Sequence, residues 1–271
     1  MSKLRTPSIL SRAALSAALA FLLLAAVSIS GCGGRTADTS QINLGTPPGT
    51  SLILAKYVAA NIGKLNDGTP ELQVSTFPDC CSANIQLALS SLAIDAALMC
   101  PDSAAALIAR DSRFFIVGPC LANSDVMVIR GDTAAAAKIG VSQEHLYQDT
   151  IVSLILGPGR ITSPMLVSAL SPAYEKGDVD GVVMDIEGAM LLQGTMLCTG
   201  GSRDDVVTYD LVARKDLPGL DNLKKAFSTA VTGLSDPLKL QSAIAAYGQF
   251  PSNGQEAALW VKENIRFLIL K

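Results

Sequence analysis

The sequence predicts an α/β protein built from two similar lobes, and three observations lead to this prediction. Leu92–Ala106 and Gly177–Ala189 share one pattern, in which a turn that ends in Asp runs into a short apolar strand. A polar turn and a helix-forming segment follow each strand, as is typical of buried parallel strands. The two copies lie far apart in the chain, which favours two lobes. One larger α/β domain whose two strands merely look alike stays the alternative.

The first lobe is predicted to alternate strands and helices in chain order. Ile42–Gly45 has the apolar pattern of a strand, and a loop with two prolines and a glycine separates it from a segment at helical spacing. Arg113–Val117 is expected to end at Gly118-Pro119-Cys120, because Gly and Pro mark turns. The strands expected are 42–45, 72–77, 96–99 and 113–117, and the helices are 52–62, 85–92 and the Ala-rich stretch after residue 103.

The second lobe is expected between two crossing strands. Asn123–Arg130 is predicted to lead into it and Thr208–Ala213 to return. Between them we expect a strand at 139–143, a helix at 147–156, a break at 157–162 before 163–170, and the strand 181–184. Three helical segments, 220–233, 237–247 and 255–270, should pack mainly against the first lobe. Residues 41–128 with 213–271 then form lobe 1, and residues 129–212 form lobe 2.

Residues 1–31 predict a lipoprotein signal peptide rather than part of the fold. Three basic residues precede the apolar run Ala13–Ile29, and small residues precede Cys32. This ending resembles the bacterial lipobox, in which the cysteine thiol is acylated. A transmembrane anchor is the alternative, because the run is nearly long enough to span a membrane. Residues 32–40 are expected to be a flexible tether, so the sequence predicts an extracytoplasmic protein attached to the bacterial cell membrane by lipid.

Composition argues against several classes of function. The net charge is −3 and Lys and Arg are not clustered, unlike in nucleic-acid-binding proteins. The only histidine, His145, lies among Gln143, Glu144 and Gln148, which favours an exposed turn and offers no catalytic partner. The glycine-containing segments match neither the dinucleotide-binding nor the P-loop pattern. We therefore expect no enzyme, no cofactor and no nucleic-acid partner.

The motifs resemble those of a known family. The segments IDAALM (94–99) and GDVDGVVM (177–184), with LGTPPGTSLILAKYV (44–58) upstream and LVARKDLPG (211–219) downstream, resemble the substrate-binding proteins of ABC importers. The branch includes sulfonate, taurine, nitrate and thiamine-precursor binders, and the likeness covers about residues 42–267. It implies a periplasmic-binding-protein-like type II fold with two hinge strands and C-terminal helices on lobe 1. It also implies a monomer that captures a small solute between its lobes and delivers it to a permease.

Candidate ligand contacts lie in loops that follow the predicted strands, where α/β proteins bind ligands. The loop Thr46–Ser51 directs backbone N–H groups and a helix dipole at a ligand and favours an anionic group. Plain helix capping is the alternative, although the family places ligand contacts in the matching loop. The candidates are Thr46, Pro48, Gly49, Thr50, Ser51, Cys80, Cys81, Ser82, Cys100, Ser103, Cys120, Asn123, Ser142, Asp185 and Glu187.

Five cysteines besides Cys32 have three possible roles. Four of them are expected just past the ends of first-lobe strands, and Cys198 is expected in a later loop. They could form disulfides that brace the cleft, contact a thiophilic metal, a metalloid or a sulfur compound, or serve as small buried apolar side chains. None has the CxxC spacing of a zinc site, and no metal site is predicted.

The sequence leaves the ligand open. Aromatic residues make up only 5% of the chain, which argues against a sugar that stacks on aromatic rings. The helix starts suit a small anion such as a sulfonate or carboxylate. Asp185 and Glu187 would repel such an anion and would suit the amine of a zwitterion such as taurine, whereas cysteines would favour a soft ligand. An extracellular sensor or adaptor with the same fold is the competing function.

Overall fold

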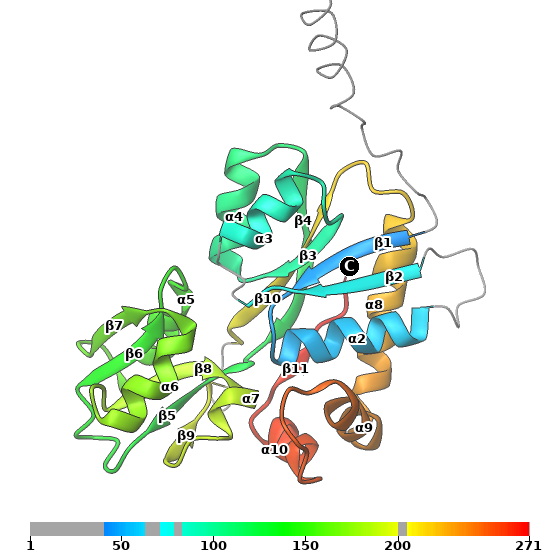
Figure 1. The fold of residues 1–271 in the computed structure, drawn as a ribbon. Coiled ribbons are helices and arrows are strands. Elements are labelled where there is room, and N and C mark those ends of the chain that lie inside the picture. Colours follow the sequence, from blue (N-terminus) through cyan, green and yellow to red (C-terminus); the bar gives the residue numbers. More distant parts are fainter. Residues whose placement is uncertain (1–40, 63–70, 79–82, 200–204, 271) are drawn as a thin grey trace, which may run out of the picture. The chain divides into compact units, whose positions relative to one another are not determined.

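The computed structural model describes residues 41–62, 71–78, 83–199 and 205–270. The predicted signal peptide, the anchor Cys32 and the tether lie outside the described residues, as do Cys80, Cys81 and Ser82. The described residues form two β-sheets with helices packed on them (Figure 1). No helix among them is long and apolar enough to cross a membrane.

The first sheet has six strands in the order β11-β4-β10-β3-β1-β2. Strands β1, β2 and β3 are parallel, and β10 lies antiparallel between β3 and β4. Because β10 comes from much later in the chain than its neighbours, the chain leaves this sheet and returns to it. The strands are β1 (Gln41–Thr46), β2 (Glu71–Thr76), β3 (Ala96–Met99), β4 (Phe114–Ala122), β10 (Val207–Arg214) and β11 (Arg266–Phe267).

Helices cover both faces of the first sheet, so its central strand has no polar face. In β3, Ala96 and Leu98 pack into one core cluster, while Ala97 and Met99 pack into another. Figure 1 shows α3 and α4 on one side of this sheet and α2 and α8 on the other. The helices are α2 (Thr50–Ile62), α3 (Ala83–Ser90), α4 (Pro101–Arg110), α8 (Leu220–Leu234), α9 (Pro237–Tyr247) and α10 (Glu256–Lys262).

The second sheet has five strands in the order β7-β6-β8-β5-β9. Its central strands β8 and β5 are antiparallel to each other, whereas β6 is parallel to both β7 and β8. The strands are β5 (Asp125–Ile129), β6 (Lys138–Ser142), β7 (Ile161–Met165), β8 (Gly181–Asp185) and β9 (Thr195–Leu197), and the helices are α5 (Tyr147–Leu156), α6 (Val167–Lys176) and α7 (Ile186–Ala189).

The chain crosses between the sheets at a short, hydrogen-bonded segment. Asn123 lies between β4 of the first sheet and β5 of the second, and it is fully buried. Its φ of 61° is left-handed, a conformation that Asn adopts more readily than most residues. Its Oδ1 accepts hydrogen bonds from the Val206 amide at 2.9 Å and the Thr199 hydroxyl at 3.1 Å, both on the returning chain. Asn123 thus ties the two crossings together.

The predicted α/β architecture with two sheets is confirmed, and three local predictions are corrected. Strand β4 does not end at Gly118 but continues to Ala122, because register shifts against β10 accommodate Pro119, which cannot donate a hydrogen bond. Residues 161–165 form the edge strand β7, where Pro164 is tolerated. The predicted helix 255–270 ends at Lys262, and β11 then pairs with β4. The exact lobe boundaries stay predictions.

Phe227 of α8 is expected to be a major stabilising residue. Its side chain is fully buried in the cluster that α2, α8 and the first sheet share. Phe227→Ala should lower the free energy of unfolding by about 3–5 kcal/mol, because the lost apolar burial leaves a cavity. Leu238→Ala, at a side chain that is 79% exposed, should change it by about 0.5 kcal/mol or less. Urea unfolding measures both variants, and equal effects would contradict this packing.

Candidate ligand-binding site

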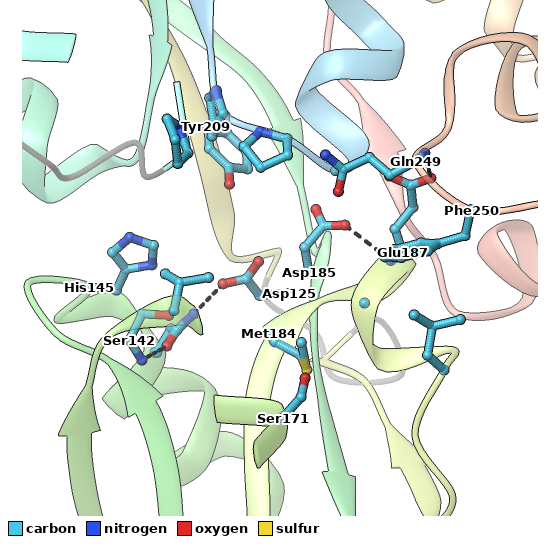
Figure 2. Close-up of a pocket in the computed structure, with 18 residues that line it drawn as sticks. Asp125, Ser142, His145, Ser171, Met184, Asp185, Glu187, Tyr209, Gln249 and Phe250 are labelled. Atoms are coloured by element: carbon cyan, nitrogen blue, oxygen red, sulfur yellow. Dashed lines mark hydrogen bonds between the residues drawn. The ribbon is translucent and has the colours of Figure 1, made fainter. Parts of the chain in front are cut away.

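One cavity of about 230 Å³ is lined by residues that belong to both sheets or to the segments attached to them (Figure 2). The lining combines carboxylates, a few uncharged polar side chains and many apolar side chains. It consists of Pro47, Pro48, Gly49, Pro78, Asp125, Ser142, His145, Gln148, Val167, Ser171, Met184, Asp185, Glu187, Gly188, Leu191, Tyr209, Gln249 and Phe250.

The cavity lies where several parallel strands end. The Pro47–Gly49 loop follows β1, Ser142 ends β6, and Asp185 ends β8. In an α/β fold the loops at the carboxyl ends of strands form the usual ligand site. Figure 2 shows Asp125 and Asp185 between Tyr209 on one side and Met184 on the other. The fold therefore brings polar side chains from distant parts of the sequence to one cavity.

Asp185 contacts the N-terminus of α2. Its Oδ1 and Oδ2 accept hydrogen bonds from the Thr50 amide at 3.3 and 3.1 Å, and Oδ1 also accepts one from the Glu187 amide at 3.0 Å. An anionic group is favourable at a helix N-terminus. The carboxyl group of Asp185 thus occupies the position at this loop that the sequence predicts for an anionic group of the ligand.

Gly49 makes this contact possible. Its φ is +94°, which side chains rarely adopt, and an added Cβ would lie 2.6 Å from the Asp185 Cγ. Thr46 and Ser51 complete the loop: the hydroxyl of Thr46 lies 3.1 Å from that of Ser51, and the Ser51 hydroxyl also lies 3.1 Å from the Pro47 carbonyl. Both hydroxyls are therefore used to hold the loop.

Asp125 is the direct cross-strand partner of Asp185. The two residues face each other in the antiparallel register of β5 and β8, an arrangement that is unfavourable for two like charges. Asp125 is only 2% exposed. Its Oδ2 accepts hydrogen bonds from the Tyr147 hydroxyl at 2.7 Å and from Gln148 Nε2 at 2.5 Å. Helix α5 therefore fixes one of the two opposed carboxylates.

Glu187 is a third buried carboxylate on the cavity wall. Its side chain is 6% exposed, and its Oε1 accepts a hydrogen bond from the Gln249 amide at 2.9 Å. Its Oε2 is buried and has no hydrogen-bond partner among the described residues. Burial raises the pKa of Glu187 above its usual value. A second, smaller cavity of about 90 Å³ adjoins Glu187 and Trp260, whose Nε1 also has no partner in the described part of the chain.

The environment of Asp185 favours its protonated form. Burial and then the charge of Asp125 raise the pKa of Asp185 to about 8, and they outweigh the amide hydrogen bonds of Glu187 and Thr50. A carboxylate that titrates near neutral pH within a cavity is typical of a functional site. A cation that entered the cavity would instead favour the ionised form.

The raised pKa predicts that the stability of the unliganded protein falls as pH rises. The folded state binds the Asp185 proton more tightly than the unfolded state does, so this stabilisation is complete below about pH 4 and lost as pH rises through about 8. Asp185→Asn keeps an acceptor for the Thr50 amide but cannot titrate. We therefore expect a weaker fall in the free energy of unfolding from pH 5 to pH 8 in this variant, measured by urea unfolding. Identical pH profiles in both proteins would contradict the raised pKa.

His145 corrects one sequence expectation. It was predicted to lie in an exposed turn, but it is 6% exposed and lines the cavity. Its ring stacks on Tyr147, with centroids 5.4 Å apart. Gln143 and Glu144 face solvent, whereas His145, just before α5, and Gln148 are buried.

Five of the predicted contact residues line the cavity: Pro48, Gly49, Ser142, Asp185 and Glu187. The others that the structure describes do not belong to its lining. Thr46 is buried at the end of β1, and Thr50 and Ser51 are buried at the start of α2. Ser103 lies in the first turn of α4, and Asn123 joins the two crossings. The hydrogen bonds of Thr46, Thr50 and Ser51 hold the loop and the helix start that border the cavity.

The described cysteines are not part of the cavity lining. Cys100 and Cys120 are fully buried in the core, and Cys120 Sγ lies 3.3 Å from the Tyr209 carbonyl as its hydrogen-bond donor. Burial raises the pKa of Cys120 well above its usual value. Cys198 is half-buried, and Cys120 and Cys198 are free thiols. These features match the third explanation, buried apolar side chains, for Cys120.

Several lining residues were missed by sequence reasoning. Asp125 is the first residue of the apolar strand β5, and Asp185 is the last residue of the apolar strand β8. An Asp at the end of an apolar strand could therefore have marked Asp125 as a candidate, as it marked Asp185. Gln148 and Tyr209 lie inside regular elements, and nothing in the local pattern marks them. Gln249 and Phe250 follow α9, far along the chain, and only tertiary packing brings them to the cavity.

The described residues contain no group of three or more His, Cys, Asp or Glu side chains that could hold a metal ion. Although Asp125, Asp185, Glu187 and His145 all line the cavity, they do not form such a group.

Comparison with known proteins shows which solved structures have a similar fold. No protein-family model and no curated protein matches the chain. Among solved structures, the ligand-binding component of an ABC-type import system from Staphylococcus aureus, with zinc bound, matches with a TM-score of 0.69 and 16% identity over 85% of this chain and 86% of that one. The periplasmic aliphatic sulphonate binding protein SsuA from Escherichia coli matches with a TM-score of 0.60 and 13% identity over 83% of each chain.

A Candida albicans gene product that defines a new family with the generic periplasmic binding protein fold matches as well. Its TM-score is 0.59 at 13% identity, over 84% of this chain and 81% of that one. Identities this low speak to the fold alone. The chain has the periplasmic binding protein fold, as its motifs predict.

Proposed function

We propose that the chain is an extracytoplasmic solute-binding lipoprotein, which captures a small solute between two lobes and delivers it to the permease of an ABC importer. The observation that carries this proposal is the cavity whose walls come from both sheets. A solute in such a cavity contacts both lobes at once. The solved structures with the same fold support the role, because one is the ligand-binding component of an ABC-type import system and another is an aliphatic sulphonate binding protein.

Solute binding shifts the population of the protein from an open form to a closed form. The two lobes hinge at the crossing around Asn123 and at the returning chain before β10, which are the segments that join the sheets. A solute that contacts the Pro47–Gly49 loop and Asp185 at the same time stabilises the closed form more than the open form. The closed form then docks on the permease. The hydrogen bonds from the Thr50 amide to Asp185 join the two sheets' segments, so we expect them to favour the closed form.

The N-terminal segment places this function at the membrane. Residues 1–31 act as the signal peptide, acylation of Cys32 anchors the mature protein, and residues 32–40 form the tether. The mature protein acts as a monomer. Labelling with a palmitate analogue tests the anchor. Cys32→Ser should lose the label and shift the protein from the membrane fraction to the soluble fraction. Labelling that persists in Cys32→Ser would contradict this anchor.

Native mass spectrometry tests solute capture. Mature protein purified without denaturation should carry a small bound mass, which is lost after unfolding and refolding and regained from a small-molecule cell extract. Cys100 and Cys120 are buried and do not line the cavity, so these two thiols should resist alkylation and should not be needed to keep this mass bound. A protein that shows no bound mass before or after exposure to extract would overturn the proposal.

A further inference from the structure

Three carboxylates share a cavity whose described lining contains neither Lys nor Arg. Asp125, Asp185 and Glu187 all line the cavity of about 230 Å³, and no Lys or Arg is among the lining residues that the structure describes. The facing positions of Asp125 and Asp185 on β5 and β8 bring two of these charges together. Buried carboxylates without a cation are costly unless they bind protons or a positively charged ligand.

An unpartnered oxygen provides an independent indication of a ligand. Glu187 is 94% buried, as its exposure of 6% implies, and its Oε1 is used by the Gln249 amide. Its Oε2 accepts no hydrogen bond within the described part of the chain, although it is buried. When Glu187 is ionised, this oxygen can only accept, so the group that completes the site must be a hydrogen-bond donor.

The position that would attract an anionic group of a solute is already occupied by the carboxyl group of Asp185. The N-terminus of α2 carries a partial positive charge at this end of the cavity, and the Asp185 carboxylate accepts a hydrogen bond from the Thr50 amide there. A sulfonate or carboxylate group would have to displace Asp185 and then lie close to Asp125 and Glu187. These like charges disfavour an anionic group as the part of the solute that is recognised.

We infer that the cavity recognises its solute by a primary ammonium group, seated against the carboxylates of Asp185 and Glu187. This inference rests on the proposed solute-binding function. An ammonium offers three N–H donors, so it can supply Glu187 Oε2 and a lone pair of Asp185 together. The apolar side chains of Met184, Leu191 and Phe250 then surround the hydrocarbon part of the solute. The class includes amines and zwitterions that carry an ammonium group.

Matched pairs of small compounds test this inference. Taurine and 2-hydroxyethanesulfonate differ in one ammonium against one hydroxyl, as do 4-amino-1-butanol and 1,4-butanediol, and 4-hydroxybutanoate supplies an anion without an ammonium. Thermal shift and calorimetry on refolded, ligand-free protein should detect binding of at least one ammonium compound, with at least about tenfold lower affinity for its hydroxyl partner. Equal or tighter binding of the hydroxyl or anionic compounds would overturn the inference and leave solute capture intact.

Glu187→Gln supplies the second arm of the test. It keeps the length of the side chain and the acceptor for the Gln249 amide, but it removes the charge. We expect about tenfold or greater loss of affinity for the ammonium compound and little change for any hydroxyl compound. Glu175→Gln, at an exposed position on α6, is the matched control and should bind as the parent does. Unchanged ammonium binding in Glu187→Gln would contradict the assignment, and absence of binding by every compound would count against both the ammonium class and solute capture.

Discussion

Gly49→Ala should abolish solute binding and destabilise the protein. The substitution forces alanine into a φ of +94° and places its Cβ 2.6 Å from the Asp185 carboxyl carbon, so the loop and Asp185 cannot keep their contact. We expect the free energy of unfolding to fall by about 2–4 kcal/mol, since left-handed strain and a steric clash add. Binding should fall below detection because the loop and Asp185 line the same cavity.

A second glycine variant separates the effect of the left-handed backbone from the effect of the clash with Asp185. Gly159 has a φ of +89°, but an added Cβ there meets nothing within 4 Å. Gly159→Ala should therefore show only the conformational cost of about 1 kcal/mol and bind solute normally. Urea unfolding and calorimetry on both variants give the comparison. If Gly49→Ala behaves like Gly159→Ala, then Asp185 does not lie against the start of α2.

Asp125→Ala is expected to have the second large effect. Removal of this carboxylate takes away the acceptor for the Tyr147 hydroxyl and for Gln148 Nε2 in a buried place, which should cost about 2–5 kcal/mol of stability. The same change removes a negative charge that faces Asp185. The pKa of Asp185 should therefore fall below about 8, because one of the causes that raise it is gone.

Two measurements check this prediction together. Urea unfolding gives the loss of stability, and the carboxyl ¹³C shift of Asp185 followed by NMR against pH gives its titration. Asp216→Ala, at a side chain that is 81% exposed, should alter neither quantity much. A variant that is destabilised while Asp185 still titrates as in the parent would show that Asp125 does not act on Asp185 by its charge.

Much of the fold was predictable because its strands carry strong local patterns. The apolar runs of β3 and β8 are buried on both faces, so they read as continuous hydrophobic segments. Helix α9 was also predicted with its observed ends, 237 and 247, since Asp236 caps it and a proline begins it. Where packing and local signals agree, the sequence is sufficient.

The errors arise where tertiary contacts override local signals. Gly118-Pro119 looks like a turn, but bulges against β10 keep the strand going past it. The C-terminal segment after Lys262 has an apolar pattern that fits a helix, yet it pairs with β4 as β11. In both places, pairing with a strand far away in the sequence determines the structure, although the local residues favour a turn or a helix.

The sequence predicted some of the residues that line the cavity and missed others. The loop at Gly49 and the acidic pair after β8 follow from the rule that strand ends carry ligand contacts, and they do line the cavity. The position of Asp185 on the α2 N-terminus depends on how β8 approaches α2, which no local pattern encodes. That contact reverses the expected preference, because it fills the place that an anion would have taken.

A crystal structure of the mature protein with the solute found by the binding screen tests the central claim most directly. We expect density that touches both the Pro47–Gly49 loop and the side chains of Asp185 and Glu187, with a nitrogen of the solute within hydrogen-bonding distance of Glu187 Oε2. Density for the solute confined to residues of one sheet, or bound outside this cavity, would contradict the claim that the two lobes capture it between them.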